Sequence, residues 1–162
     1  MNDAAAPPRP HPSTVAPATP PATHYRSKTL ATWLAALLGP LGVHRLYLKG
    51  LRDAWAWAYP LPTALGLIGA SRMSSFGQDD RLAMFFVPLL GLMISVSMLT
   101  AIVWGLTPDE RWDQRHNGGR RGAAAGWAVV IAVIFALLVG SAVLMGTIAY
   151  SIQHFFEWQL GL

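Results

Sequence analysis

The sequence contains no cysteine and few charged residues. The absence of cysteine excludes disulfide bonds, thiolate metal sites and a cysteine nucleophile. Only 12% of the 162 residues are charged, about half the share usual in a soluble domain, whereas 53% are hydrophobic. The apolar residues gather in long runs instead of amphipathic patterns, so the sequence predicts a chain whose solvent is lipid.

The sequence also lacks the spacings that catalytic and metal sites require. The five histidines are scattered, without the spacing of a zinc site. No serine lies in a Gly-x-Ser-x-Gly elbow, and no glycine-rich nucleotide loop follows a strand. We therefore expect no enzymatic activity, no cofactor and no metal. A catalytic reading of Asp109, Glu110, Asp113 and His116 is the alternative, but helix capping and solvation explain all four.

Positive charge is spread thinly along the chain. The net charge of +4 would suit a nucleic-acid partner, but the basic residues stand singly or in pairs beside apolar runs. Such residues anchor and orient membrane segments. No basic helix or aromatic-rich motif of a nucleic-acid binder is present. We expect the lipid bilayer, and no nucleic acid, as a partner.

Residues 1–28 differ in composition from the rest of the chain. They are rich in proline and alanine, and Val15 is their only branched aliphatic residue. Such a segment cannot bury enough apolar surface to offset the entropy of ordering, so we expect a disordered tail. A proline-rich recognition ligand is the alternative. The pattern of a cleaved signal peptide is missing.

Four apolar runs follow the tail, and none contains Asp, Glu, Lys or Arg. They cover residues 29–43, 54–71, 82–106 and 122–153. A membrane helix needs about 20 residues, so the last two runs suffice easily, the second is marginal and the first is short. The runs predict an all-α integral membrane protein with four transmembrane helices in two hairpins. The hairpins occupy residues 29–72 and 73–162, and the second contains an interfacial loop at 105–121.

Small residues recur at four-residue spacing in all four runs. Such spacing lets helix backbones approach closely in lipid, where packing replaces the hydrophobic effect as the force between helices. The recurrence predicts a packed bundle. The residues concerned are Ala31, Ala35 and Gly39; Ala54 and Ala58; Ser97, Ala101 and Gly105; Gly118, Gly122 and Gly126; and the pairs Ala136–Gly140 and Ala142–Gly146.

The stretch GPLGVHRLYLKG, residues 39–50, interrupts the first run. Pro40 removes a backbone donor and disfavours helix at the residue before it, so the helix should kink or stop near Leu38. Gly42 permits a turn. His44 and Arg45 then form a polar turn at the membrane surface, with Tyr47 as an interfacial ring. The stretch predicts the bend of a two-helix membrane hairpin.

This stretch resembles the TM-two domain family, called NINE proteins in bacteria, over roughly residues 26–72. The family has two membrane helices joined by a loop with a pattern close to Gly-x-His-Arg-Phe-Tyr-x-Gly. Gly42, His44, Arg45 and Tyr47 match, whereas Leu46 replaces Phe and Lys49 displaces the closing glycine to Gly50. Ser71 and Arg72 stand where members often have an acidic residue. The resemblance implies an integral membrane hairpin in the bacterial inner membrane. It implies no biochemical activity, because the bacterial members of the family have no settled one.

Two polar segments carry helix-capping patterns. Thr107, Pro108 and Glu110 read as an N-cap, a first-turn proline and a capping-box glutamate, which predicts a short helix with Trp112 at the interface. The pair Asp79 and Asp80 precedes the third run, where carboxylates complement the helix dipole. Metal binding by this aspartate pair is the weaker alternative.

These observations favour a non-enzymatic membrane protein that acts through helix–helix or protein–protein contacts and self-associates. A small transporter or channel component is the alternative. Arg45 serves either as a topology anchor or as a specific contact to anionic lipid headgroups or to the polar end of a neighbouring helix.

Orientation follows from the basic residues. With four spans, the tail, the loop from Arg72 to Arg81 and the C-terminus share one side and carry five basic residues, against seven on the other. The positive-inside rule then predicts that both termini lie outside the cytoplasm.

Overall fold

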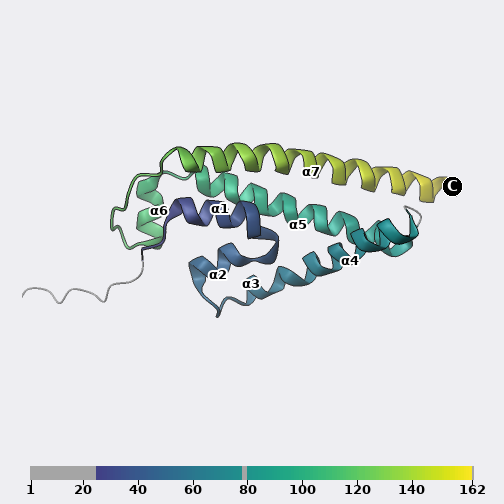
Figure 1. The fold of residues 1–162 in the computed structure, drawn as a ribbon, viewed down its shortest axis with the longest axis horizontal. Helices are drawn as coiled ribbons and strands as arrows, with labels where there is room; N and C mark the ends of the chain where they lie inside the picture. Colours follow the sequence, from purple (N-terminus) through teal and green to yellow (C-terminus); the bar gives the residue numbers. More distant parts are fainter. Residues whose placement is uncertain (1–24, 78–79, 162) are drawn as a thin grey trace, which may run out of the picture.

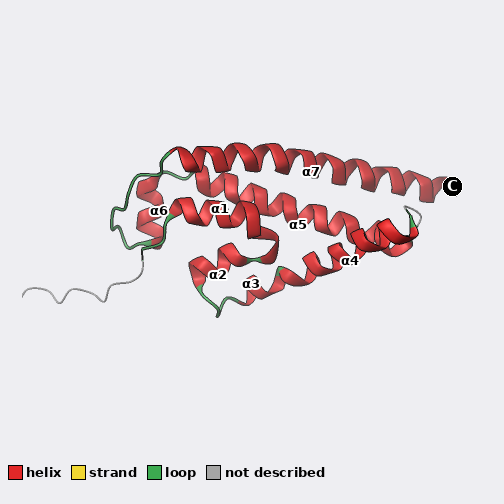
Figure 2. Cartoon of the chain, in the orientation of Figure 1, coloured by secondary structure: helices red, strands yellow, loops and turns green. Residues whose placement is uncertain are grey.

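A computed structural model describes residues 25–77 and 80–161 of the chain, and its secondary structure there consists of helices only (Figures 1 and 2). The predicted tail lies outside the described residues up to position 24. The elements are α1 (Lys28–Leu38), the 3-10 helix η1 (Gly39–Leu41), α2 (Val43–Lys49), α3 (Ala54–Ala58), α4 (Pro60–Phe76), α5 (Arg81–Leu106), α6 (Asp109–His116) and α7 (Trp127–Leu160).

Two antiparallel helices, α5 and α7, run the length of the molecule side by side (Figure 1). They are 26 and 34 residues long, and the mean hydropathy of an 18-residue stretch reaches 2.3 in α5 and 2.9 in α7, so both are long and apolar enough to cross a membrane. Asp80 caps α5 by accepting a hydrogen bond from the amide of Ala83, as predicted. The helix ends at Thr107, whose extended backbone suits the residue before a proline.

The fourth apolar run forms a helix later than its composition predicts. Gly118 and Gly119 adopt positive φ angles, and residues 117–126 form a loop that α7 follows from Trp127. Glycine costs about 1 kcal/mol in a helix interior, so the glycine-rich start of the run favours the loop. The expected helical face of Gly118, Gly122 and Gly126 is therefore wrong.

Helix α4 packs on the half of α5 that begins at Arg81. A Cβ atom at Gly69 would lie 2.5 Å from Cβ of Phe86, and one at Gly66 would overlap Leu90, so the two backbones are in close contact. A break at Tyr59 separates α4 from α3, because Pro60 occupies the first turn of α4. The 23 residues from Ala54 to Phe76 extend about 34 Å at the rise of an α-helix.

The first apolar run does not form a spanning helix. Helix α1 has 11 residues and extends about 16 Å, roughly half of a bilayer's hydrocarbon core. At Gly39 and Pro40 the chain enters η1 and then returns as α2, so residues 28–49 form a short helical hairpin (Figure 1). Among the described residues, two helices, α5 and α7, have the length and composition of a membrane span, so the four expected from the sequence are not confirmed.

The bundle has an end where α6 lies and an opposite end where α4 meets α5 (Figure 1). We call them the α6 end and the α4–α5 end. The amide of Ser27 donates to the Tyr47 hydroxyl at 3.0 Å, so the start of α1 and the end of α2 lie together near the α6 end. The C-terminal part of α7 lies beside the start of α5, since Trp158 and Arg81 line one cavity. The two ends of the described chain, residues 25 and 161, therefore lie at opposite ends of the bundle.

The interior is built mainly from small side chains. Ala35 and Ala36 of α1 pack with Met98 and Ala101 of α5 and with Ala136 of α7. The small face predicted for α1 is buried, as are Ser97 and Ala101, whereas the pairs Ala54–Ala58 and Ala142–Gly146 are exposed. Large apolar side chains, such as Leu99, Leu138 and Met145, point outward from α5 and α7 and are at least 60% exposed.

Candidate functional site

The turn of the hairpin is fitted closely into the bundle at its two glycines. A Cβ at Gly39 would lie 2.5 Å from Cβ of Ser97 on α5. Gly42 has φ +75°, and a Cβ there would lie 2.5 Å from the carbonyl oxygen of Ala56. The Thr63 hydroxyl donates to the carbonyl of Pro40 at 2.6 Å. The turn thus joins α1–α2 to both α4 and α5. The predicted end of the first helix before Gly39 and Pro40 is confirmed, whereas the chain turns back into α2 and not directly into the second apolar run.

His44 differs from its predicted position at the membrane surface. Its side chain is buried, with 1% of the residue exposed, and lies edge-on to Tyr59 at 5.5 Å and to Trp104 at 5.3 Å between ring centroids. Its Nδ1 makes no hydrogen bond within the described part of the chain. His44 is therefore a packing residue between α2, α3–α4 and α5. The sequence showed the polar side chain but not the aromatic rings that cover it.

Arg45 makes an ion pair inside the protein. Its Nε donates to Oδ2 of Asp53 at 2.9 Å, at the start of α3, and the guanidinium holds the pKa of Asp53 below its usual value. The sequence allowed Arg45 to be a topology anchor, to contact anionic lipid headgroups or to contact the polar end of a neighbouring helix. The ion pair with Asp53 is a contact of the last kind. Gly50, with φ +78°, ends α2 and donates its amide to the carbonyl of Leu46.

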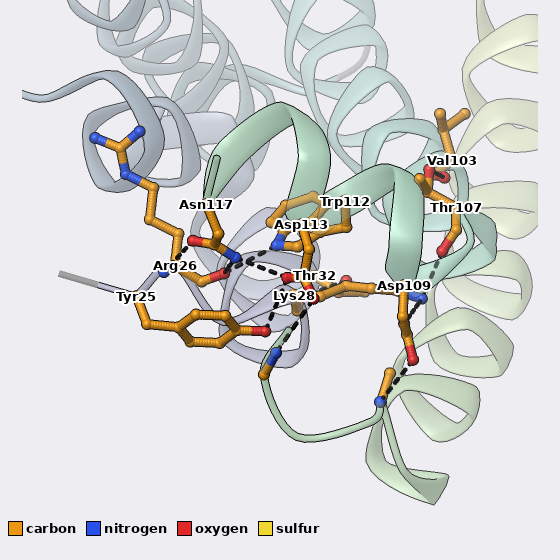
Figure 3. Close-up of polar contacts among 12 residues, drawn as sticks. Tyr25, Arg26, Lys28, Thr32, Val103, Thr107, Asp109, Trp112, Asp113 and Asn117 are labelled. Atoms are coloured by element: carbon orange, nitrogen blue, oxygen red, sulfur yellow. Dashed lines mark hydrogen bonds and ion pairs between the residues drawn. The ribbon is translucent and has the colours of Figure 1, made fainter. Parts of the chain in front are cut away.

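A second polar cluster joins the start of α1 to α6 (Figure 3). The Tyr25 hydroxyl donates to Oδ1 of Asp113 at 3.0 Å, and Asn117 accepts the amide of Arg26 at 2.8 Å. The carbonyl of Arg26 accepts from Nε1 of Trp112 at 2.9 Å. Residues 25 and 26, predicted as part of the tail, are thus held by the helix after α5.

Lys28 extends this cluster to the end of α5. Its ammonium donates to the carbonyl of Thr107 at 2.6 Å and to Oδ1 of Asp109 at 2.8 Å, and it lowers the pKa of Asp109 (Figure 3). The other carboxylate oxygen of Asp109 accepts the amide of Ala125 at 3.0 Å. One lysine and one aspartate therefore tie α1, α5, α6 and the loop before α7 together. We call the residues Tyr25, Arg26, Lys28, Asp109, Trp112, Asp113 and Asn117 the polar clamp.

The short helix predicted after the third run is present as α6, but its caps differ. Thr107 ends α5, and its hydroxyl donates back to the carbonyl of Val103 at 2.7 Å. Pro108 takes the N-cap position without a side-chain hydrogen bond, so the capping box to Glu110 is wrong. Trp112 was expected at the membrane interface, but it is only 2% exposed. Its ring points from α6 toward the bundle and packs against Trp104 of α5.

Charge is distributed unevenly between the two ends. Nine basic residues lie toward the α6 end, and seven of these make no ion pair with any described residue. Lys28 and Arg45 are the paired ones. The other seven are Arg26, Lys49, Arg52, Arg111, Arg115, Arg120 and Arg121.

At the α4–α5 end, the described basic residues are Arg72 and Arg81. Arg72 makes two hydrogen bonds to Asp80, at 2.7 and 2.9 Å. Asp79 lies outside the described residues, and so does the aspartate-pair metal site. No group of three potential metal ligands occurs in residues 25–77 and 80–161.

The four residues that allowed a catalytic reading do not converge on a cavity with a free nucleophile. Asp109 and Asp113 serve the polar clamp, and His116 stacks on Trp112 at 4.2 Å. Sequence reasoning missed a pair in α7. Nδ1 of His154 lies 2.7 Å from Oε2 of Glu157, at a helical spacing of three. The spacing is visible in the sequence, but residues 154–160 lie beyond the predicted apolar run.

A comparison of the chain with protein-family models, curated proteins and solved structures found no match. The resemblance to the TM-two domain family stays a prediction based on Gly42, His44, Arg45 and Tyr47.

Proposed function

We propose that the chain is a multi-pass integral membrane protein without enzymatic activity, which acts through helix–helix or protein–protein contacts in the membrane. The observation that carries the proposal is the outward apolar surface of α5 and α7. Leu99, Leu138 and Met145 are among many large apolar side chains at least half exposed on these helices. A surface of this extent in water would cause association, whereas lipid or another membrane helix covers it favourably.

The arrangement of the helices supports three crossings, by α3–α4, α5 and α7, and one N-terminal hairpin that enters from the α6 end and returns. The hairpin of residues 28–49 is about half as deep as the hydrocarbon core, and its tip is covered by α4 and α5. Backbone that leaves a helix within a membrane is tolerated where protein surrounds it. In place of the four crossings expected from the sequence, we therefore propose three.

The uneven charge supports a cytoplasmic α6 end. Nine of the basic residues that the structure describes lie toward that end and two lie at the other, and lysine and arginine are enriched on the cytoplasmic side of membrane proteins. In this orientation the start of the chain is cytoplasmic, the C-terminus lies outside, and the tail does not cross the membrane.

A transporter or channel component is the second candidate, and the hydroxyl groups within the spans speak against it. Those of Ser95, Thr100 and Thr147 donate to carbonyls four residues earlier in their own helices. Ser97 is buried against the hairpin turn. Hydroxyls used in this way do not line a polar path, so contacts between helices remain the better account of these spans.

Carbonate extraction of membranes, followed by crosslinking in membranes, tests the proposal. The protein should stay in the membrane pellet with an integral marker, and crosslinking should give a species larger than one chain. A peripheral protein, released by carbonate, is the matched control. Release of the chain with that control would contradict membrane integration. A strictly monomeric protein that conducts ions in liposomes would replace the contact function with the transporter one.

A further inference from the structure

Two cavities lie along the contact between α5 and α7. The larger, about 670 Å³, lies toward the α4–α5 end and is lined by Arg81, Phe85, Pro88, His154 and Trp158, among others. The smaller, about 310 Å³, lies near the middle of the two helices and has an apolar lining that includes Leu92, Val96, Leu99, Leu137 and Leu144.

The two cavities lie on one face of the helix pair. Their lining residues on α5 and on α7 recur at steps of three, four or seven, which keeps them on one side of each helix. On α5 this series consists of residues 81, 85, 88, 92, 95 and 99, and on α7 of residues 158, 155, 151, 144, 141 and 137. The other lining residues flank the series at positions 84, 96, 98 and 102 on α5 and 136, 140 and 154 on α7. We call this continuous feature the α5–α7 groove.

Close packing of small residues forms the bottom of the groove. A Cβ at Gly91 would overlap the Thr147 side chain, and one at Gly140 would lie 2.7 Å from Cβ of Met98. At these two glycines the backbone of one helix therefore contacts a side chain of the other, while the larger side chains on either side leave the groove open. From Arg81 to Leu99 the groove runs 18 residues, about 27 Å.

One end of the groove carries Arg81 and His154, which have charged or polar groups without partners among the described residues. Arg81 makes no ion pair with any described residue. The His154 side chain is 8% exposed, its Nδ1 is held by Glu157 at 2.7 Å, and its Nε2 has no hydrogen-bond partner within the described part of the chain. Pro88 has no amide to donate to the carbonyl of Met84, which lines the same cavity. Buried groups of this kind are ordinarily satisfied by a partner or by water.

We propose that the α5–α7 groove binds one phospholipid with an anionic headgroup. Arg81 and Nε2 of His154 hold the phosphate, Trp158 lies beside the headgroup region, and an acyl chain follows the groove past Leu92, Val96 and Leu144. The proposal rests on the proposed membrane location. A leaflet's acyl chains reach about half of the roughly 30 Å hydrocarbon core, so the groove is long enough for them.

The charge pattern favours a lipid over a second copy of the chain as the occupant. One end of the groove carries the cationic side chain of Arg81, and the rest of its lining is mainly apolar. This arrangement complements a lipid that has an anionic headgroup and apolar acyl chains. In a second copy, the acidic residue on α5 or α7 is Glu157, and its carboxylate is already engaged by His154 and Gln153, so it is not free to meet Arg81.

The test is native mass spectrometry of the full chain, delipidated in mild detergent and titrated with phosphatidylglycerol. We expect one tightly bound lipid per chain and binding about tenfold weaker for Arg81→Gln, since charge-assisted hydrogen bonds to phosphate are the strong ones. The matched control is Arg121→Gln, which removes an unpaired arginine at the opposite end and should bind as the wild type does.

A second pair of variants tests the apolar part of the groove. Ser141→Trp fills it and should weaken binding, whereas Met145→Trp adds the same ring to an exposed position that does not line it. All variants should keep the wild-type melting temperature and remain in the carbonate-washed membrane, which separates loss of the lipid site from failure of the membrane location.

Three results would overturn the lipid site. These are unchanged binding by both Arg81→Gln and Ser141→Trp, equal affinity for zwitterionic phosphatidylcholine, and displacement of the phospholipid by an equimolar free fatty acid. A dimer that forms only in delipidated protein and that Ser141→Trp abolishes would assign the groove to a second copy instead.

Discussion

At Gly42 the backbone conformation and the neighbouring chain both exclude a side chain. The residue has φ +75° and ψ 6°, a left-handed conformation that costs most residues about 1–2 kcal/mol. A Cβ would also lie 2.5 Å from the carbonyl oxygen of Ala56, which belongs to α3 and has no flexible end to move. The glycine of the motif is therefore required for the contact between the hairpin turn and α3.

We predict that Gly42→Ala lowers the free energy of unfolding by about 2–4 kcal/mol, the sum of backbone strain and overpacking. Gly161→Ala is the matched control. Gly161 is also left-handed, with φ 68° and ψ 27°, but no atom lies within 4 Å of a Cβ there. Its substitution should cost about 1 kcal/mol or less, because the helix end can fray. Unfolding by denaturing detergent, followed by circular dichroism, measures both. If both variants lost the same free energy of unfolding, the backbone at Ala56 would have to move away from the new Cβ without cost.

The stability that the polar clamp contributes depends on pH through the carboxyl group of Asp113. Its carboxylate accepts hydrogen bonds from Asn117, Gly122 and Tyr25, and these bonds, with that of Asn117 first, hold its pKa below the usual value. A carboxyl whose pKa is lower in the folded state binds its proton more weakly there than in the unfolded chain. Its contribution to stability is complete above the ordinary aspartate pKa of about 3.9 and is lost as the pH falls through the lowered one.

We therefore predict that Asp113→Asn lowers the melting temperature at pH 7, and that the difference from wild type shrinks as the pH is lowered below about 4. Glu110→Gln, at an exposed position of the same helix, should keep the wild-type pH dependence. Thermal unfolding in detergent across pH 3–7 gives the comparison. A difference that stays constant over this range would mean that Asp113 does not contribute through its charge.

Among the elements, α5 agrees best with its sequence and α1 agrees least. The ends of α5 are marked by local chemistry, a capping Asp80 and a Thr107 that precedes proline. The first run is equally apolar, but its composition does not show whether the chain crosses or turns back after Gly39. That outcome depends on the fit of the turn against Ser97 and Thr63, which are distant in sequence.

The same distinction applies to the candidate site. The bend of residues 39–42 was predictable because proline and glycine act locally. Burial of His44 was not, since the rings that cover it, Tyr59 and Trp104, come from other helices. Nor could the polar clamp be predicted, because Tyr25 and Asp113 are 88 positions apart and no short motif joins them.

The hairpin of residues 28–49 makes a prediction about accessibility. Because α2 returns toward the start of α1, cysteines introduced at Arg26 and Arg52 should both react with a membrane-impermeant maleimide from the cytoplasmic side. A cysteine at Ser75, at the end of α4, should react only from the other side. The natural chain has no cysteine, so each variant reports one position. Labelling of positions 26 and 52 from opposite sides of the membrane would contradict the hairpin and support the four transmembrane helices expected from the sequence.

At the scale of the whole molecule, the two ends differ in charge as well as in structure. The described carboxylates toward the α6 end are Asp53, Asp109, Glu110 and Asp113, fewer than half of the basic residues there. At the other end, Arg72 is paired with Asp80. An anionic cytoplasmic leaflet attracts each unpaired basic residue by about 1 kcal/mol, so the difference favours one orientation strongly.

We predict that green fluorescent protein fused before Met1 is fluorescent in a bacterial host, and that alkaline phosphatase fused after Leu162 is active. Each reporter works in one compartment only, so exchanging the two fusions is the control and should silence both. An inactive phosphatase together with a fluorescent C-terminal fusion would place the C-terminus in the cytoplasm and reverse the orientation.

The contacts of α1 have a consequence for how the protein is made. Helix α1 packs on α5 and α7, and Nε1 of Trp33 donates to the carbonyl of Ala128 at 3.1 Å. Helix α5 follows α1 in the chain, and Ala128 of α7 is synthesised 95 residues after Trp33, so α1 is made well before its partners. The hairpin made first is thus completed last, and until then it must remain at the membrane surface or with an insertion factor. Ribosomes stalled before residue 127 should carry an N-terminal hairpin that protease still digests.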